Sequence, residues 1–274
     1  MLSNQDLSHI YRHAYIPEHL PDYVEAISNA EPHLIENHLC FIIKNHLLFI
    51  GYSLSGDSRD SVRAYSAACS EFRPSTAAII APELWKIEDY FEEQPVDSYY
   101  RLELPLVAVP PGVAYMVRRA EKDLVLDTGK FGREHKKLIK SFIAGHSLSD
   151  QQNYIYKHLH HYLKRSKTAR LLEVRKKDRL AAFTIVDLGS ADSAFYLFNF
   201  RSTRVDVPGA SDLLFREMVN LAQSEGKKAI NLGLGINKGI RRFKEKWGGV
   251  PFLPYASAMV HRGPVNLGNL AKKL

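Results

Sequence analysis

Residues 207–226 read VPGASDLLFREMVNLAQSEG, and this stretch decides how the second half of the chain folds. Pro208-Gly209 predicts the start of a helix and Gly226 predicts its end. Between them, four apolar side chains recur at helical spacing and predict a buried stripe: Leu214, Met218, Leu221 and Ala222. The segment before the helix, Arg201–Ser211, then links a strand to a helix amino terminus, which is a connection typical of α/β proteins.

The next stretch, residues 228–249, reads KAINLGLGINKGIRRFKEKWGG. Lys228–Leu232 predicts a short buried strand, and Asn237–Trp247 predicts a helix that Gly248-Gly249 ends. On that helix one narrow apolar stripe is expected, made of Ile236, Ile240, Phe243 and Trp247. Lys244 falls at the edge of the stripe, where its side chain can reach into a cleft, while the other basic residues form a solvated face.

Further out, both halves of the chain repeat the order hairpin, helix, short strand, helix, strand. The expected elements of the first half are hairpin strands 39–44 and 47–54, helix 58–71, strand 76–80, helix 83–91, strand 98–104 and a hairpin over 112–127. Those that complete the second half are helices 133–144 and 149–166 and strands 169–176, 180–188, 194–201 and 252–260. In strand 194–201, alternation predicts Tyr196, Phe198 and Phe200 on one side, with Leu197 and Asn199 on the other. The recurrence predicts two α/β (α+β) domains, 1–130 and 131–274, with mixed sheets flanked by helices.

The charge of the chain is divided unequally between these halves. Residues 1–130 carry 11 Lys and Arg against 19 Asp and Glu, or −8, and residues 131–274 carry 26 against 11, or +15. This division favours an anionic partner for the second half, such as coenzyme A, transfer RNA or an acidic lipid surface, or else mutual attraction of the halves. No run of roughly 18 apolar residues predicts a membrane span. The polar start lacks the pattern of a secretion signal, so we expect a cytoplasmic protein.

The helix that follows Pro208 offers a place for an anion. Pro208, Gly209, Ala210 and Ser211 precede or begin it, and the last three are small enough for an anion to approach the unpaired backbone amides. A phosphate or carboxylate site is one interpretation, and an ordinary helix cap is the other.

Metal and nucleophile chemistry find little support in the sequence. His158, His160 and His161 cluster on one predicted helix, but only His158 and His161 share a face, so we expect a surface cluster and no metal site. Gly233, Gly235 and Gly239 follow a strand, yet their GxGxxxG spacing departs from the dinucleotide-binding pattern.

Several short motifs of the second half resemble the Fem-type branch of the GNAT superfamily, which includes peptidoglycan aminoacyl transferases and a domain of phosphatidylglycerol lysyltransferases. The motifs are Gly209-Ala210-Ser211-Asp212-Leu213-Leu214, Ala222–Gly226, Asn231-Leu232-Gly233, Gly239–Lys244 and Trp247-Gly248-Gly249. The resemblance implies two tandem GNAT-like domains and a donor, either an acyl-coenzyme A or an aminoacyl-transfer RNA, bound where two central strands splay apart.

By the same resemblance, donor phosphates would meet Gly209–Ser211, and Lys244 would stabilise charge while the acyl or aminoacyl group moves to an amine or hydroxyl. Tyr255, on the last strand, is a weaker candidate for a general acid. Two features depart from the family: Val207 stands where the acetyltransferase phosphate loop has its first glycine, and no long helical arm is visible. The alternative function is a non-catalytic GNAT-like protein that docks on nucleic acid or an anionic membrane surface.

Overall fold

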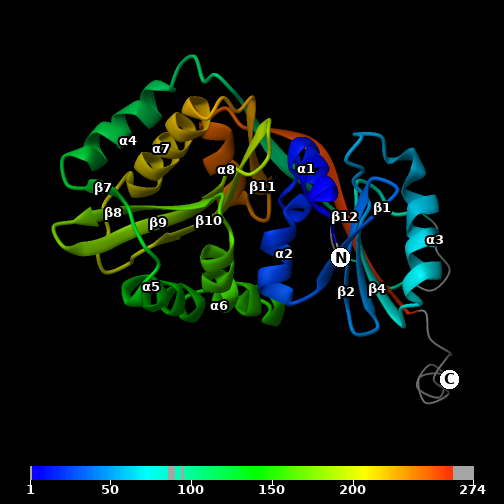
Figure 1. The fold of residues 1–274 in the computed structure, drawn as a ribbon. Helices are drawn as coiled ribbons and strands as arrows, with labels where there is room; N and C mark the ends of the chain where they lie inside the picture. The colour runs from blue at the N-terminus through cyan, green and yellow to red at the C-terminus, as the bar shows by residue number, and fades with distance from the viewer. Residues whose placement is uncertain (1, 86–89, 94–95, 262–274) are drawn as a thin grey trace.

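A computed structural model describes residues 2–85, 90–93 and 96–261 of the chain (Figure 1). The described strands form one continuous mixed sheet in the order β1-β2-β3-β4-β12-β6-β11-β10-β9-β8-β7, and β5 also pairs with β12. The protein therefore has the mixed α/β architecture that the sequence predicts, with helices on both faces of the larger part of the sheet (Figure 1).

The elements of the first part are α1 Asn4–His13, α2 Pro21–Ser28, β1 Glu31–Ile35, β2 His38–Ile43, β3 His46–Ile50, α3 Ser61–Phe72, β4 Thr76–Ala81, β5 Tyr90–Glu93 and β6 Asp97–Glu103, with 3-10 turns at Pro17–His19 and Ser58–Asp60. Those that follow are α4 Pro111–Glu121, β7 Val125–Thr128, α5 Arg133–Ala144, α6 Asp150–Arg165, β8 Ala169–Lys176, β9 Arg179–Asp187, β10 Ser193–Arg201, α7 Ala210–Ser224, β11 Ala229–Leu234, α8 Lys238–Lys246 and β12 Val250–His261.

The long strand β12 joins a smaller part of the sheet, formed by β1 to β4, to a larger part, formed by β6 to β11. Its first half pairs with β6, from Val250 opposite Arg101 to Tyr255 opposite Asp97. Its second half pairs with β4, from Ala256 opposite Ala81 to His261 opposite Thr76, so a strand late in the chain completes the part of the sheet formed by β1 to β4 (Figure 1). Strand β6 in turn lies between β12 and β11, although it precedes the predicted domain boundary. The division at residues 130 and 131 stays a prediction.

Two apolar layers cover the larger part of the sheet. Helices α4 and α7 lie on one face and helices α5 and α6 on the other (Figure 1). Beneath α4 and α7 the core includes Val117, Leu214 and Met218, and beneath α5 and α6 it includes Leu138 and Phe183. Each of these helices buries one apolar stripe against the sheet, so the central strands are covered on both faces.

The hairpin predicted over residues 112–127 is wrong. This segment is the helix α4 followed by the edge strand β7, which pairs antiparallel with β8. Pro111 takes the first helical turn, where its missing N–H costs nothing, and Val113, Val117 and Ala120 are buried at helical spacing. This helical stripe packs α4 onto α7.

The helix predicted over residues 83–91 is also wrong where the structure describes it. Residues 83–85 are irregular, and Tyr90 begins strand β5. Residues 86–89 of that prediction lie outside the described residues.

The side-chain alternation predicted for residues 194–201 fails at one position. The pairing of β10 with β9 shifts register between Tyr196 and Phe198, so Leu197 is an extra residue in the strand. This β-bulge places Tyr196 in the core of α4 and α7, whereas Phe198 and Phe200 pack in the core of α5 and α6. Residues expected on one face thus point to opposite faces.

None of the helices in the described part of the chain combines the length and the hydrophobicity of a membrane span.

Candidate functional site

The two central parallel strands, β10 and β11, separate from each other near the middle of the larger part of the sheet. Strands β10 and β11 pair only from Ser193 opposite Ala229 to Phe195 opposite Asn231. Beyond that point β10 stays with β9 as far as Arg201, while β11 stays with β6 as far as Leu234. The sheet is therefore open between them, at the carboxyl ends of two parallel strands, where α/β proteins commonly bind ligands.

A cavity of about 380 Å³ lies at this opening, and we call it the cleft. Its walls come from the diverging strands, from the first turn of α7, from α8 and from α5 and α6. The described lining residues are Phe142, His146, Tyr156, Tyr196, Leu197, Phe198, Asn199, Phe200, Ser211, Leu232, Gly233, Leu234, Ile236, Asn237, Gly239, Ile240, Phe243 and Lys244. A mostly apolar hollow with a few polar groups is the usual form of a small-molecule site.

Lys244 is the one Lys, Arg, Asp or Glu among these lining residues. Its side chain is almost wholly buried, at 3% exposure, and Nζ donates a hydrogen bond to the Leu234 carbonyl oxygen over 2.5 Å. Nζ also lies 5.5 Å from the centroid of the Tyr100 ring. Burial lowers the pKa of Lys244 to about 7, because the charged ammonium loses its water. The cleft thus holds one amine that can carry or release a proton near neutral pH.

Both ends of α8 are fixed, and this positions Lys244. At the start, Asn237 Oδ1 accepts a hydrogen bond from the Ile240 amide over 2.9 Å. At the end, the fully buried Trp247 donates from Nε1 to Asp212 Oδ1 of α7 over 3.0 Å. Gly249 follows closely, and a Cβ there would lie 2.6 Å from a Leu232 methyl carbon and 3.0 Å from the Lys244 carbonyl oxygen. The Trp-Gly-Gly motif therefore allows α8 to pack tightly against β11.

The bulge in β10 directs polar groups to the cleft. Asn199 Nδ2 donates to Ser211 Oγ over 3.0 Å, which links the strand to the first turn of α7. Asn199 Oδ1 is shielded from solvent and has no hydrogen-bond partner within the described residues. Sequence reasoning gave Asn199 no role. An amide in an otherwise apolar strand was the signal that could have identified it.

The four residues predicted to form the phosphate site differ in whether they line the cleft. Ser211 lines the cleft, whereas Pro208, Gly209 and Ala210 do not appear among its described lining residues. Gly209 has a φ of 86°, and a Cβ there would lie 2.2 Å from the Met116 carbonyl oxygen, so it lets α7 begin close against α4. Within the described residues, no side chain caps the first amides of α7.

Tyr255 lies away from the cleft. Its ring packs 5.7 Å from that of Tyr99, in a core cluster that also contains Tyr52 and Phe41. Burial raises the pKa of Tyr255. The structure therefore brings Lys244 and Ser211 to one cavity and leaves Tyr255 in another part of the core.

A second hollow, of about 420 Å³, adjoins the same strand, and we call it the basic groove. Its charged lining residues are Glu134, Lys137, Lys140, Arg179, Arg201 and Arg204. Its one acid pairs with Arg175 over 2.8 Å, and Arg201 pairs with Asp206. The other four cations leave the groove strongly positive, as expected from the charge of the second half. Because α5 and the end of β10 line both hollows, the groove and the cleft are neighbours.

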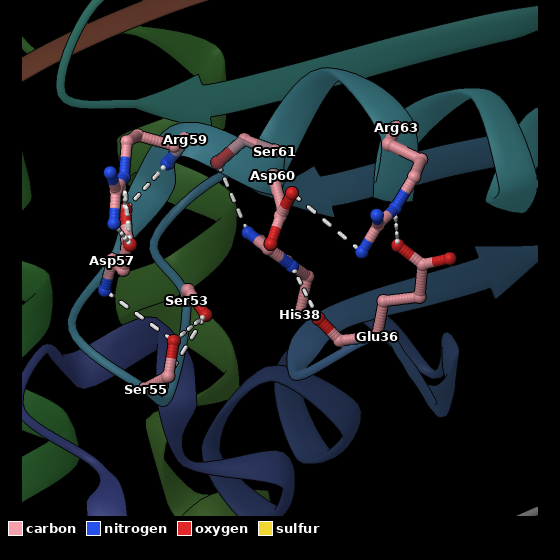
Figure 2. Close-up of polar contacts among 9 residues, drawn as sticks. All are labelled: Glu36, His38, Ser53, Ser55, Asp57, Arg59, Asp60, Ser61 and Arg63. Atoms are coloured by element: carbon pink, nitrogen blue, oxygen red, sulfur yellow. Dashed lines mark hydrogen bonds and ion pairs between the residues drawn. The ribbon is translucent and has the colours of Figure 1, made fainter.

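The smaller part of the molecule has a polar cluster of its own, which Figure 2 shows. The hydroxyl of Ser61 lies between His38 Nε2, at 3.0 Å, and the Gly51 carbonyl oxygen, at 2.9 Å. His38 is fully buried and Ser61 is 3% exposed, and the His38 ring lies within 2.9 Å of the Glu36 carbonyl oxygen. Because its polar atoms contact one another and the backbone at the ends of the strands, this cluster anchors α3 to the strands.

Metal ligands do not gather in the described part of the chain. No group of three or more His, Cys, Asp or Glu residues there is arranged to hold an ion. The histidines of α6 pack against one another: the rings of His158 and His161 are stacked with centroids 5.7 Å apart, and those of His160 and His161 are tilted with centroids 4.0 Å apart.

No protein-family model matches the sequence, and no curated protein sequence matches it. The fold, in contrast, is similar to solved structures over almost the whole chain. It is similar to FemX with a TM-score of 0.62 and 10% identity, over 93% of this chain and 96% of that one. It is similar to L-PGS from Bacillus licheniformis with a TM-score of 0.58 and 12% identity, over 98% and 95% of the two chains.

A further similar structure is a tandem GNAT protein from the clavulanic acid biosynthesis pathway, with a TM-score of 0.52 and 13% identity over 84% and 79% of the chains. The chain therefore shares the fold of FemX, L-PGS and the tandem GNAT protein, which is the GNAT-like fold that the sequence motifs predict. At such low identity the similarity establishes the fold, and function must be inferred from the site.

Proposed function

We propose that the protein is an acyltransferase that moves an acyl or aminoacyl group from an activated donor, acyl-coenzyme A or aminoacyl-transfer RNA, to an amine or hydroxyl. The observation that carries this proposal is the open end of β10 and β11, with the buried amine of Lys244 inside it. The fold shared with L-PGS, FemX and a tandem GNAT protein agrees with it.

In the proposed reaction the donor carbonyl lies in the cleft near Lys244. The acceptor nitrogen or oxygen attacks the carbonyl carbon and forms the new C–N or C–O bond. The bond from that carbon to sulfur or to the ribose oxygen then breaks, the leaving group departs as a thiol or hydroxyl, and the proton of the acceptor passes to it or to water. Protonated Lys244 stabilises the oxyanion formed between these steps. The reaction needs positioning and charge stabilisation rather than a covalent enzyme intermediate.

The donor phosphates are assigned to the start of α7 in this proposal. Ser211 lines the cleft, and the first amides of α7 lack a side-chain cap within the described residues. Pro208, Gly209 and Ala210 then serve by shaping that helix start. Tyr255 has no role in the proposed reaction, because it is not among the described lining residues of the cleft.

The test combines binding with turnover. Acetyl-coenzyme A, octanoyl-coenzyme A and an aminoacyl-transfer RNA are titrated by calorimetry, and transfer to hydroxylamine is then followed with each donor that binds. Lys244→Met, which nearly keeps the side-chain volume, is expected to lower kcat/KM about 100-fold, the usual effect of losing one oxyanion donor. Lys238→Ala, on the exposed side of α8, is the matched control. A folded protein that binds none of these donors contradicts the proposal.

The basic groove favours a second candidate function, a GNAT-like protein that docks on nucleic acid or an anionic membrane. Such binding would fall steeply with salt and would be shared among many Lys and Arg residues. It would also survive Lys244→Met. A groove variant, Lys137→Glu with Lys140→Glu, separates the two functions because it should abolish docking and leave the chemistry of the cleft in place.

A further inference from the structure

The walls of the cleft select against charge. Its described lining residues include neither Asp nor Glu, and the one charged side chain is the cation Lys244. Aromatic and aliphatic side chains are frequent among the other lining residues, and they include Tyr156, Leu197, Phe198, Phe200, Ile240 and Phe243. A second ammonium group brought into this space would lose its water and would face Lys244 with no carboxylate to pair with.

The acid whose charge acts on Lys244 is Asp97, and its carboxylate already accepts hydrogen bonds from the backbone. Asp97 Oδ2 accepts a hydrogen bond from the Ile236 amide over 2.6 Å, and Oδ1 accepts from the Ser98 amide over 2.7 Å. Asp97 is also outside the described lining residues of the cleft. It therefore serves the loop between β11 and α8 rather than a bound ligand.

One polar atom of the cleft, Asn199 Oδ1, is a candidate to accept a hydrogen bond from a ligand. Asn199 uses Nδ2 to bind Ser211 Oγ, and its Oδ1 is shielded from solvent without a hydrogen-bond partner in the described part of the chain. A buried acceptor is normally satisfied, so this oxygen is suited to an N–H group of the bound molecule. The volume of about 380 Å³ is near the small end for ligand sites and fits an aminoacyl or medium-length acyl group, not the whole donor.

Resting on the proposed transferase function, we infer that the cleft binds a transferred group with an apolar side chain and an N–H donated to Asn199 Oδ1, and that it rejects a group with a charged side chain such as lysyl. The aromatic and aliphatic walls hold the side chain, Asn199 orients the group, and Lys244 meets the carbonyl. Leucyl, phenylalanyl and similar groups are therefore preferred.

The selectivity is tested at pH 9, where the α-amino groups of the probes are mostly neutral and the lysine side chain keeps its charge. Leucinamide, phenylalaninamide and lysinamide are titrated into the full chain, and the dissociation constants are measured by calorimetry or NMR. The two apolar amides are expected to bind at least about 10-fold more tightly than lysinamide. Ile240→Asp places a carboxylate in the cleft and should reverse the order. Val107→Asp adds the same charge at a position that is 93% exposed and outside the cleft, and should leave the order unchanged.

The role of Asn199 is tested with 4-methylpentanamide, which has the leucinamide side chain but lacks its α-amino group. The wild-type protein should prefer leucinamide about 10-fold, and Asn199→Leu should remove that preference while its thermal unfolding confirms an intact fold. If lysinamide binds as tightly as leucinamide, or if neither apolar amide binds, the inference is overturned. Transfer that depends on Lys244 but prefers a lysyl donor would overturn the inference alone, whereas absence of transfer from every donor would overturn the proposed function.

Discussion

At the scale of single residues, the burial of Lys244 is expected to make the activity depend on pH near neutrality. The pKa of the buried amine falls to about 7, so its proton is lost as the pH rises through that value. If the cation stabilises the oxyanion, kcat/KM with hydroxylamine, which is unprotonated in this range, should fall as the pH rises above about 7. Lys244→Arg keeps its charge and should move this fall to much higher pH. Identical profiles for the two proteins would exclude the assigned role.

The same amine makes stability depend on pH. Between the folded pKa of about 7 and the usual value of 10.5, the unfolded state binds more protons than the folded state. The free energy of unfolding should therefore rise as the pH is raised through this interval, by an amount of the order of a few kcal/mol. Lys244→Met should remove this rise in urea titrations at pH 7 and pH 9.5. A variant as pH-dependent as the wild type would place the effect elsewhere.

Gly209 illustrates a residue whose importance depends on a neighbour. Alanine there would be strained at a φ of 86° and would place its Cβ 2.2 Å from the Met116 carbonyl oxygen. Gly209→Ala should destabilise the protein by roughly 3 kcal/mol or more in urea unfolding. Gly226→Ala, at a φ of 69° with open space around it, isolates the backbone strain and should cost only about 1 kcal/mol. If the two variants lose the same unfolding free energy, the contact with α4 adds no cost beyond the backbone strain.

At the scale of elements, α8 brings Lys244 to the cleft only if its first turn is formed. Asn237→Ala removes the cap on the Ile240 amide and should cost about 1 kcal/mol of unfolding free energy. It should also lower kcat/KM, because the cap holds the helix beside β11, while Asn237→Ser should recover most of both losses. Full activity in the alanine variant would show that packing of Trp247 alone positions α8.

The elements also show where sequence reasoning succeeds. The strongly periodic helix α7 and the capped helix α6, whose Ser149 side chain accepts from the Gln152 amide, are formed as predicted, because their signals are local. The bulge at Leu197 has no local signal, since it is set by register with β9. For that reason Lys244 could be placed from its position on a helix, whereas the position of Asn199 relative to the bulge could not be predicted from local sequence.

At the scale of the whole molecule, the exchange of strands makes the two parts interdependent. A fragment of residues 131–274 would lack β6, which lies between β11 and β12, and would leave both strands with unpaired edges. We expect this fragment not to unfold cooperatively in circular dichroism, whereas residues 97–274, which restore β6, α4 and β7, should regain a transition. A cooperative transition in the shorter fragment would support a domain boundary near residue 130.

By itself, the sequence determined the α/β class, most of the helices and strands of the second half, the basic charge of that half and the motifs that lead to the GNAT-like fold. These features arise from periodicity, capping and composition, which act over a few residues. Only the tertiary structure decided that β10 and β11 part after three residue pairs, that β12 completes both parts of the sheet and that Lys244 and Asn199 meet in one cleft. Each of these depends on pairing between segments distant in the chain, and no local pattern encodes the register of such pairs.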